Sequence, residues 1–184
     1  MTTPGGRPTA RASPTIRPAG PHDANAIREI YNEAVETTTA TFDTQARSLP
    51  EQRQWLAHHG ARHPVLVAEV HGAVVGWVAL SPWSDRRAYD GTGEVSVYVG
   101  SRSRGLGIGR ALLESIVLKA RGLDFHTILA RVAEGNPISR QLHVAAGFTP
   151  VGVMHEVGRK FGRFLDVELL ELHLGPRAGQ HDRA

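Results

Sequence analysis

The chain has 184 residues, of which 41% are hydrophobic, so it can build one substantial core but hardly two. It contains no cysteine, which excludes disulfides, thiolate zinc sites and cysteine nucleophiles and fits a reducing, cytoplasmic compartment. No apolar run approaches the ~20 residues that span a bilayer, so we expect no membrane partner. The pI is near 9.8, but the net charge is only +3 and aromatic residues are few, so we expect no nucleic-acid partner.

The two ends of the chain differ in composition from its middle. Residues 1–13 alternate Thr, Pro, Gly, Ala and Arg without apolar periodicity, and we expect a disordered tail there. An Arg-rich, acid-poor start is also typical of a transit peptide, although no amphipathic pattern supports one. Residues 175–184 have the composition of a flexible, solvated tail. We therefore predict one domain over residues 14–174.

The first elements of this domain are a short strand and a helix. Thr15–Arg17 is the candidate strand. A helix is expected from Ala24 to about Glu36, because apolar residues recur on one side of it and Asp23 is a plausible N-cap.

The next stretch, residues 37–43, has poor helix propensity and is expected to be a loop or an extended segment. Phe42 lies within it, either as a core residue or as a wall of the substrate site. A second helix is predicted to begin at Pro50 and to end near Gly60.

Two strands follow, over residues 65–70 and 74–80, and His71-Gly-Ala between them is a tight hairpin signal. The polar loop from Ser81 to Gly93 carries Arg86, Arg87 and Tyr89. Paired arginines suit a carboxylate or a phosphinate, so these residues are candidates for substrate binding, although exposed arginines are ordinarily only solvated.

The most informative stretch runs from Val95 to Glu114. It begins as a β-branched strand, passes through an Arg/Ser/Gly turn and continues as a helix with apolar periodicity. Gly105, Gly107 and Gly109 remove side chains where the backbone enters the helix, so the free N–H groups of the helix start can approach a ligand. Such a helix start prefers an anion, most naturally phosphate, and the neighbouring arginines strengthen that preference.

Two better-known phosphate motifs do not match this loop. A P-loop needs Lys followed by Ser or Thr directly after its last glycine, and here Arg110-Ala111 follows. A dinucleotide fingerprint needs a third glycine three positions after the second, where Arg110 stands. The loop is therefore interpreted as a pyrophosphate site of another kind.

The remaining elements are a buried strand over residues 127–132, a helix and two closing strands. Asn136 is expected to cap the helix, with Pro137 at its first position and Gly147 as its stop. The closing strands are predicted over residues 148–153 and 164–174, separated by the charged turn Gly158–Arg163.

Arg104-Gly-Leu-Gly-Ile-Gly109 after a strand resembles the pyrophosphate loop of the GNAT N-acetyltransferases, which bind acetyl-CoA. The order of elements from Thr15 to Leu174 is similar throughout, and the similarity is closer to one branch, the phosphinothricin and methionine-sulfoximine N-acetyltransferases. The segments that carry the branch resemblance are Tyr31-Asn32, Ala40–Asp43, Glu94–Val99, Asn136, Leu142-His143 and Lys160–Asp166.

The resemblance implies an α/β (α+β) fold, a mixed and mostly antiparallel sheet that is splayed at its centre and flanked by about four helices. It also implies that pantetheine lies in the splay. The cofactor-binding residues that follow from it are Val97, Tyr98, Val99, Arg104, Gly105, Leu106, Gly107, Ile108, Gly109, Arg110, Asn136 and Ser139.

Acetyl transfer needs a neutral amine and a protonated leaving thiol. Glu94 is a carboxylate in a valine-rich strand, where the family often has its general base, although a solvent-facing glutamate is the alternative. His143 stands where many relatives have a tyrosine that protonates the thiolate, so it could be base or acid, or a packing residue. Tyr98 and Tyr89 are weaker substitutes for that tyrosine.

The sequence and the resemblance together predict transfer of acetyl from acetyl-CoA to the primary amine of a small amino-acid-like acceptor. Arg86, Arg87, Tyr89 and Phe42 are the expected substrate residues. No metal is expected, since Gly60 interrupts the helix that would align His59 with His63. A homodimer is implied by the branch. The alternatives are acetylation of protein N-termini, lysines or aminoglycosides, and a non-catalytic acyl-CoA-binding module.

Overall fold

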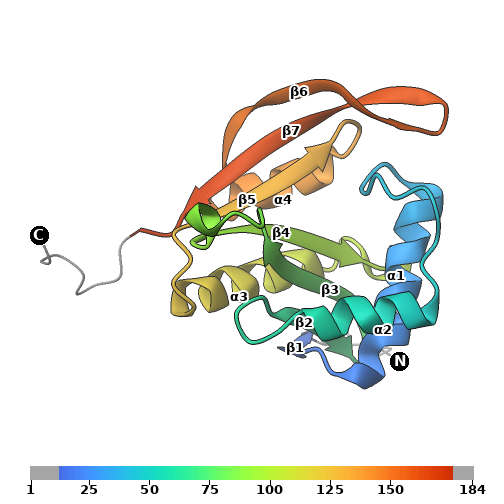
Figure 1. Cartoon of the computed structure of the whole chain (residues 1–184). Coiled ribbons are helices and arrows are strands. Elements are labelled where there is room, and N and C mark those ends of the chain that lie inside the picture. Colours follow the sequence, from blue (N-terminus) through green and yellow to red (C-terminus); the bar gives the residue numbers. More distant parts are fainter. Residues whose placement is uncertain (1–12, 176–184) are drawn as a thin grey trace, which may run out of the picture.

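The computed structural model describes residues 13–175, so the predicted tails fall almost wholly outside the described part of the chain. Within that part, a seven-stranded sheet has the strand order β1-β2-β3-β4-β5-β7-β6 (Figure 1). The elements are β1 (Thr15–Pro18), η1 (Pro21–Asp23), α1 (Ala24–Thr37), α2 (Leu49–His58), β2 (Val65–Val70), β3 (Ala73–Pro82), η2 (Arg87–Tyr89), β4 (Thr92–Val99), η3 (Ser101–Ser103), α3 (Ile108–Gly122), β5 (Thr127–Ala133), α4 (Pro137–Ala145), β6 (Thr149–Lys160) and β7 (Arg163–His173).

The centre of the sheet is where β4 meets β5. All other neighbouring strands pair antiparallel, but β4 and β5 run parallel and pair only from Thr92–Glu94 to Thr127–Leu129. Beyond Glu94 the rest of β4 has no partner on this side, so the two strands diverge. The predicted splayed, mostly antiparallel sheet with four flanking α-helices is confirmed for the described residues.

Helices cover both faces of the sheet (Figure 1), and an apolar cluster lies on each face. On one face, α3 packs Leu112 and Ile116 against Val95 of β4. On the other face, α1 packs Ile27 against Trp77, and Tyr98 of β4 joins this cluster. Because successive side chains of a strand point to opposite faces, Glu94 and Ser96 share the face of Tyr98, the one that α1 and α2 cover.

Two helix starts differ from the sequence predictions. Asp23 does not cap α1, because its carboxylate accepts hydrogen bonds from the Arg17 guanidinium and from the Gly20 N–H instead. The buried carboxylate is thereby paired with a charge, which a cap would not provide. The second helix begins at Leu49, where Ser48 and Glu51 form a capping box just before the predicted start at Pro50.

The closing hairpin is longer than the sequence predicted. Residues 158–160 are strand, and the turn is confined to Phe161-Gly162, which have φ of 51° and 80°. Two successive residues with positive φ make a tight hairpin turn, so the charged residues on either side can pair as strands. The predicted charged turn Gly158–Arg163 is wrong in this respect.

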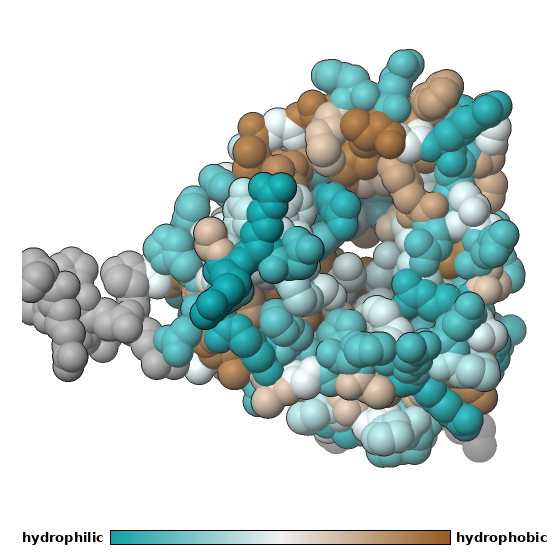
Figure 2. Space-filling view, in the orientation of Figure 1, coloured by the Kyte–Doolittle hydropathy of each residue, from teal (hydrophilic) through white to brown (hydrophobic). Residues whose placement is uncertain are grey.

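The edge strand β6 has an exposed apolar surface. Residues 149–157 are all exposed, and Figure 2 shows hydrophobic side chains gathered over the β6–β7 hairpin. The large exposed apolar residues of the hairpin are Val151, Val153, Met154, Val157, Phe161 and Phe164. Over residues 13–175 no helix is both long enough and apolar enough to cross a membrane.

Candidate active site

The start of α3 is built from backbone rather than from side chains. Gly105 and Gly107 have φ of 73° and 81°, a conformation that glycine adopts without steric cost. Within residues 13–175, the N–H groups of Gly107, Ile108 and Gly109 donate to no protein acceptor. Free amides at a helix start attract an anion, so this end of α3 is suited to a phosphate group.

A cleft of about 730 Å³ extends from this helix start along the open edge of β4. It contains every cofactor-binding residue predicted from the sequence except Leu106, whose side chain is exposed. Those that line it are Val97, Tyr98, Val99, Arg104, Gly105, Gly107, Ile108, Gly109, Arg110, Asn136 and Ser139. The unpaired edge of β4 over residues 97–99 leaves backbone groups facing the cleft.

Acidic side chains partly balance the arginines around the loop. Arg104 donates to the Val99 carbonyl at 3.1 Å and lies 3.5 Å from the Glu33 carboxylate. Arg110 pairs with Glu114 one helical turn away, at 2.7 Å. The anion preference of this site therefore rests on the amides at least as much as on the arginines.

The helix α4 forms the opposite wall of the cleft. Asn136 caps it as predicted, because its Oδ1 accepts from the Ser139 N–H at 3.2 Å. His143 is only 3% exposed and meets the Phe148 ring edge-on, with the ring centroids 5.2 Å apart.

The His143 ring is turned away from the cleft, which it does not line. Its Nδ1–H donates to the Ser139 carbonyl at 2.8 Å, and Nε2 has no hydrogen-bond partner among the described residues. Burial lowers the pKa of His143, so the ring is neutral at pH 7. In this position His143 ties the first turn of α4 to the core, and its catalytic role stays a prediction.

Glu94 lies at the point where β4 and β5 separate. Its Oε1 and Oε2 each accept a hydrogen bond of 2.6 Å from Arg131 of β5, through Nε and Nη2 respectively. Hydrogen bonding to the carboxylate raises the pKa of Arg131, which stays charged. The guanidinium also lies over the Trp83 ring, 5.7 Å from its centroid.

Sequence reasoning missed Arg131. The sequence does contain a hint of the pair, because Arg131 is the one charged residue of β5, just as Glu94 is the one charged residue of β4. What the sequence lacks is the pairing of two residues that are 37 positions apart.

Ser81 and His59 stand next to Glu94 on the same face. Ser81 lies opposite Glu94 in the β3–β4 ladder, and its Oγ is 3.2 Å from His59 Nε2. The Nδ1–H of His59 donates to the Trp55 carbonyl at 2.9 Å, and desolvation lowers the pKa of His59. A neutral imidazole and a hydroxyl therefore extend the polar surface around the carboxylate.

The loop that follows α1 is tied to both of its neighbours. The Tyr31 hydroxyl donates to Asp43 at 2.6 Å, and burial raises the pKa of Tyr31 to about 12. Lys160 of β6 is buried and donates to the Thr41 carbonyl at 2.7 Å. The Phe42 ring packs directly on Gly158, where even a methyl group would overlap it. Phe42 therefore helps to join this loop to the β6–β7 hairpin, and it does not line the cleft along the open edge of β4.

Arg86, Arg87 and Tyr89 lie on and beside η2, exposed to solvent. Within residues 13–175 the two guanidinium groups make no hydrogen bond or ion pair. The structure does not bring them into contact with Glu94, although Trp83 of the same loop contacts Arg131. Their role in substrate binding stays a prediction.

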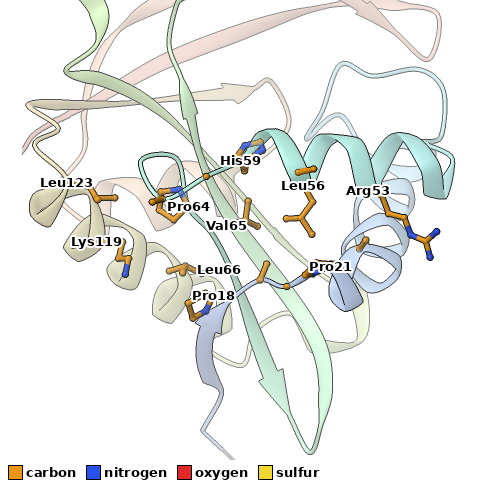
Figure 3. Close-up of a pocket in the computed structure, with 16 residues that line it drawn as sticks. Pro18, Pro21, Arg53, Leu56, His59, Pro64, Val65, Leu66, Lys119 and Leu123 are labelled. Carbon is orange, nitrogen blue, oxygen red and sulfur yellow. The ribbon is translucent and has the colours of Figure 1, made fainter.

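A second cavity, of about 610 Å³, lies beside β1 and β2, and His59 also lines it (Figure 3). Its lining comes from β1, α2, β2 and α3 and includes Pro18, Leu56, Val65, Leu66 and Lys119. It contains none of the site residues predicted from the sequence. Among the described residues there is also no cluster of three or more side chains that could hold a metal ion.

A splayed pair of strands beside a glycine-built helix start defines the class of protein: a transferase that holds a long, phosphate-bearing donor. Comparison with known proteins agrees. The family model described as "Acetyltransferase (GNAT) domain" matches residues 16–169. The chain belongs to this family, and it is an acetyl-CoA-dependent N-acetyltransferase.

Its relatives differ in their acceptors. An L-methionine sulfoximine/L-methionine sulfone acetyltransferase of Pseudomonas paraeruginosa is 38% identical over 89% of this chain and 96% of its own. The structure of a phosphinothricin acetyltransferase from Sinorhizobium meliloti in complex with acetyl-CoA superposes with a TM-score of 0.86 at 35% identity, covering 89% of each chain. A ribosomal-protein-alanine N-acetyltransferase from Brucella melitensis reaches a TM-score of 0.84 at 39% identity, over 86% of this chain and 99% of its own.

Proposed function

We propose that this enzyme acetylates the primary amine of a small amino-acid-like acceptor of the methionine sulfoximine or phosphinothricin type. The observation that carries the proposal is the position of Glu94. It lies where the β4–β5 pairing ends, on the face opposite α3, with Arg131 beside it. The names of two of the relatives support the same acceptor class.

The donor cleft fits acetyl-CoA, which supplies the acetyl group as an activated thioester. The free amides of residues 107–109 would bind the pyrophosphate. The open edge of β4 over Val97–Val99 would bond the pantetheine amides, with Asn136 and Ser139 across the cleft. The loop itself is open at two of its glycines, because no heavy atom lies within 4 Å of where a Cβ of Gly105 or Gly107 would stand.

Glu94 would accept the proton of the acceptor amine, directly or through a water molecule. The α-amino group of a peptide has a pKa of about 8, so making it neutral at pH 7 costs roughly 1.4 kcal/mol, against about 4.6 kcal/mol for a lysine side chain. In a free amino acid the adjacent carboxylate stabilises the ammonium, so the cost lies between these two values. A base beside the acceptor's nitrogen is therefore needed, which is the role proposed for Glu94.

The leaving thiolate must also be protonated. The sequence leaves His143 open as base, acid or packing residue, and in the structure its single ring N–H donates to the Ser139 carbonyl. To act as the acid, the ring would have to leave its packing against Phe148. We propose that its main contribution is to position the start of α4.

A second copy of the chain is proposed to cover the β6–β7 hairpin. An edge strand with exposed Val151, Val153 and Val157 is an unprotected apolar surface, and a symmetric dimer would bury it. Light scattering should report a mass of twice that of the chain. Val153→Lys should then give a monomer, whereas a wild-type monomer would contradict the proposal.

The acceptor class is tested by an acetylation assay. Phosphinothricin, methionine sulfoximine, ordinary amino acids and a peptide with an N-terminal alanine are offered separately with acetyl-CoA. We expect the free amino acids to be modified and the peptide to react poorly. The peptide is the second candidate because of the ribosomal-protein-alanine relative, and acetylation of the peptide alone would overturn the proposal.

A further inference from the structure

The guanidinium of Arg131 has more hydrogen-bond donors than Glu94 uses. Arginine carries five N–H groups, and the pair consumes one from Nε and one from Nη2. Within residues 13–175 the remaining donors have no acceptor. The Arg131 side chain is 54% exposed, whereas that of Glu94 is 15% exposed, so one edge of the guanidinium stays open beside a largely covered carboxylate.

The place of Arg131 in the sheet puts its side chain on the same face as Glu94. The last β4–β5 pair is Glu94 with Leu129, and Arg131 follows two residues later on the same face of β5. Its neighbours Ala130 and Val132 point the other way, into the core under α3. Contacts with Glu94 on one side and the Trp83 indole on another hold the guanidinium in place.

Stability is a poor explanation for this arrangement. Ion pairs as exposed as this one contribute little to the free energy of unfolding. Arg140 and Glu168 form a pair of similar exposure, 48% and 20%, on the opposite face of the sheet. The distinguishing feature of Arg131 is therefore its position beside the candidate base.

A carboxylate and a guanidinium side by side are complementary to the two charged ends of an α-amino acid. The nitrogen and the carboxyl carbon of an amino acid are two bonds apart, or about 2.5 Å. The Glu94 oxygens and the Arg131 nitrogens are also adjacent, 2.6 Å apart. One acceptor can thus place its nitrogen on Glu94 and its carboxylate on the open edge of Arg131 through charge-assisted hydrogen bonds.

We infer that Arg131 is the α-carboxylate anchor of the acceptor site and that, with Glu94, it selects free α-amino acids over other primary amines. This inference rests on the proposed function. It leaves Arg86 and Arg87 for an acidic group on the acceptor's side chain. It also sets the acceptor's nitrogen beside Glu94, because in an α-amino acid a single carbon separates the nitrogen from the carboxylate that Arg131 would hold.

The test compares an amino acid with its own α-carboxamide, for instance methionine sulfone with methionine sulfone amide, in the wild type and in Arg131→Gln, Arg131→Lys and Arg140→Gln. The α-carboxamide has a less basic amine than the free acid, so kcat/KM is compared per neutral amine. On this basis we expect the wild type to favour the free acid by roughly 10- to 100-fold, as the loss of a charge-assisted hydrogen bond implies. Arg131→Gln should bring this ratio near one, mainly through the KM of the acid. Arg131→Lys should retain part of the preference, and Arg140→Gln all of it.

Acetyl-CoA affinity is measured in parallel, since it should be unchanged in every variant that folds. Equal wild-type activity on acid and amide, or an undiminished preference in Arg131→Gln, would overturn the role of Arg131 while leaving the enzyme an amino-acid acetyltransferase. If the wild type acetylates the alanine peptide but neither methionine sulfone nor its amide, the proposed function itself fails, and this inference fails with it.

Discussion

The two sides of the proposed catalytic cleft differ in the groups that form them. The proposed donor side is formed mainly by the free backbone amides of consecutive residues, 107–109, at the start of α3. The proposed acceptor side is formed by side chains from β3, β4, β5 and the loop after β3, with Glu94 and Arg131 at its centre. The first is a matter of local backbone conformation, and the second depends on how the sheet assembles.

This difference separates the consequences of mutation. A change on the donor side alters acetyl-CoA binding whatever the acceptor is, because the amides contact the donor alone. A change on the acceptor side alters the acceptors that react and leaves the donor affinity intact. Each substitution below is expected to move one of these quantities and not the other.

The largest effect is expected for Glu94→Gln. Loss of the base should reduce kcat/KM for amino-acid acceptors by roughly 10²- to 10⁴-fold, while the acetyl-CoA dissociation constant stays within about twofold. Steady-state kinetics and calorimetry measure the two quantities. Glu168→Gln is the matched control, since it removes the carboxylate of the Arg140 pair on the other face and should change neither.

A non-catalytic acyl-CoA-binding module would respond differently to the same experiment. It would bind acetyl-CoA in both variants and have no turnover to lose. If Glu94→Gln weakens acetyl-CoA binding as much as it weakens turnover, the separation of the two sides is wrong.

On the donor side, Gly107→Val should raise the dissociation constant for acetyl-CoA by about 10- to 100-fold. Gly107 has φ of 81°, and a β-branched residue there forces the backbone to turn and redirects the amides of the first helical turn. Gly72→Val is the control, because Gly72 has φ of 80° in the β2–β3 turn and equally open surroundings. Both variants should lose similar stability, and an equal loss of acetyl-CoA affinity in both would contradict the assignment.

The same contrast explains what the sequence could predict. The glycine loop, the strand before it and the helix after it are contiguous, so spacing and residue type were sufficient to predict these elements, and their binding of the donor stays a prediction. The splay followed from the family resemblance, and the structure has it where Glu94 ends the β4–β5 pairing. The Arg131 contact could not be predicted, because it depends on a strand register that no local pattern encodes.

His143 illustrates a second limit. Its place in α4 matched the family pattern, but the direction of its ring depends on the Phe148 contact and on the carbonyl of Ser139. The β6–β7 turn illustrates a third, since charged residues at positions 158–163 resembled a loop, although Phe161 and Gly162 alone make the turn. Side-chain direction and strand length are tertiary outcomes in both cases.

His143 should act on stability through pH. Burial lowers its pKa in the folded state below the unfolded value of about 6.5, so below that pH the unfolded chain binds a proton that the folded chain does not. The free energy of unfolding should therefore fall from pH 7 to pH 5, by up to about 1.4 kcal/mol per pH unit from this group. Burial lowers the pKa values of His59 and His63 too, so their contributions have the same sign.

Urea unfolding at pH 7.5, 6.5 and 5.5 measures this dependence. His143→Gln should reduce this dependence, because the amide can still donate to the Ser139 carbonyl but does not titrate, while His59 and His63 keep their contributions. If His143→Gln instead lowers the turnover number by about 100-fold or more and retains acetyl-CoA affinity, His143 is a catalytic base or acid, as the sequence allowed.

The smallest effect is expected for Arg86→Ala combined with Arg87→Ala. Both guanidinium groups are exposed and lack partners among residues 13–175, so stability should change by no more than about 0.5 kcal/mol. Water and salt also weaken their attraction for an acceptor, so KM for phosphinothricin should rise only about 3- to 10-fold. KM for methionine sulfone, whose side chain is uncharged, should not change, because Arg131 still holds its carboxylate. An equal rise for both acceptors would mean that the two arginines shape the loop around Trp83 instead of binding a side-chain acid, and the acceptor side would then depend on one anchor rather than two.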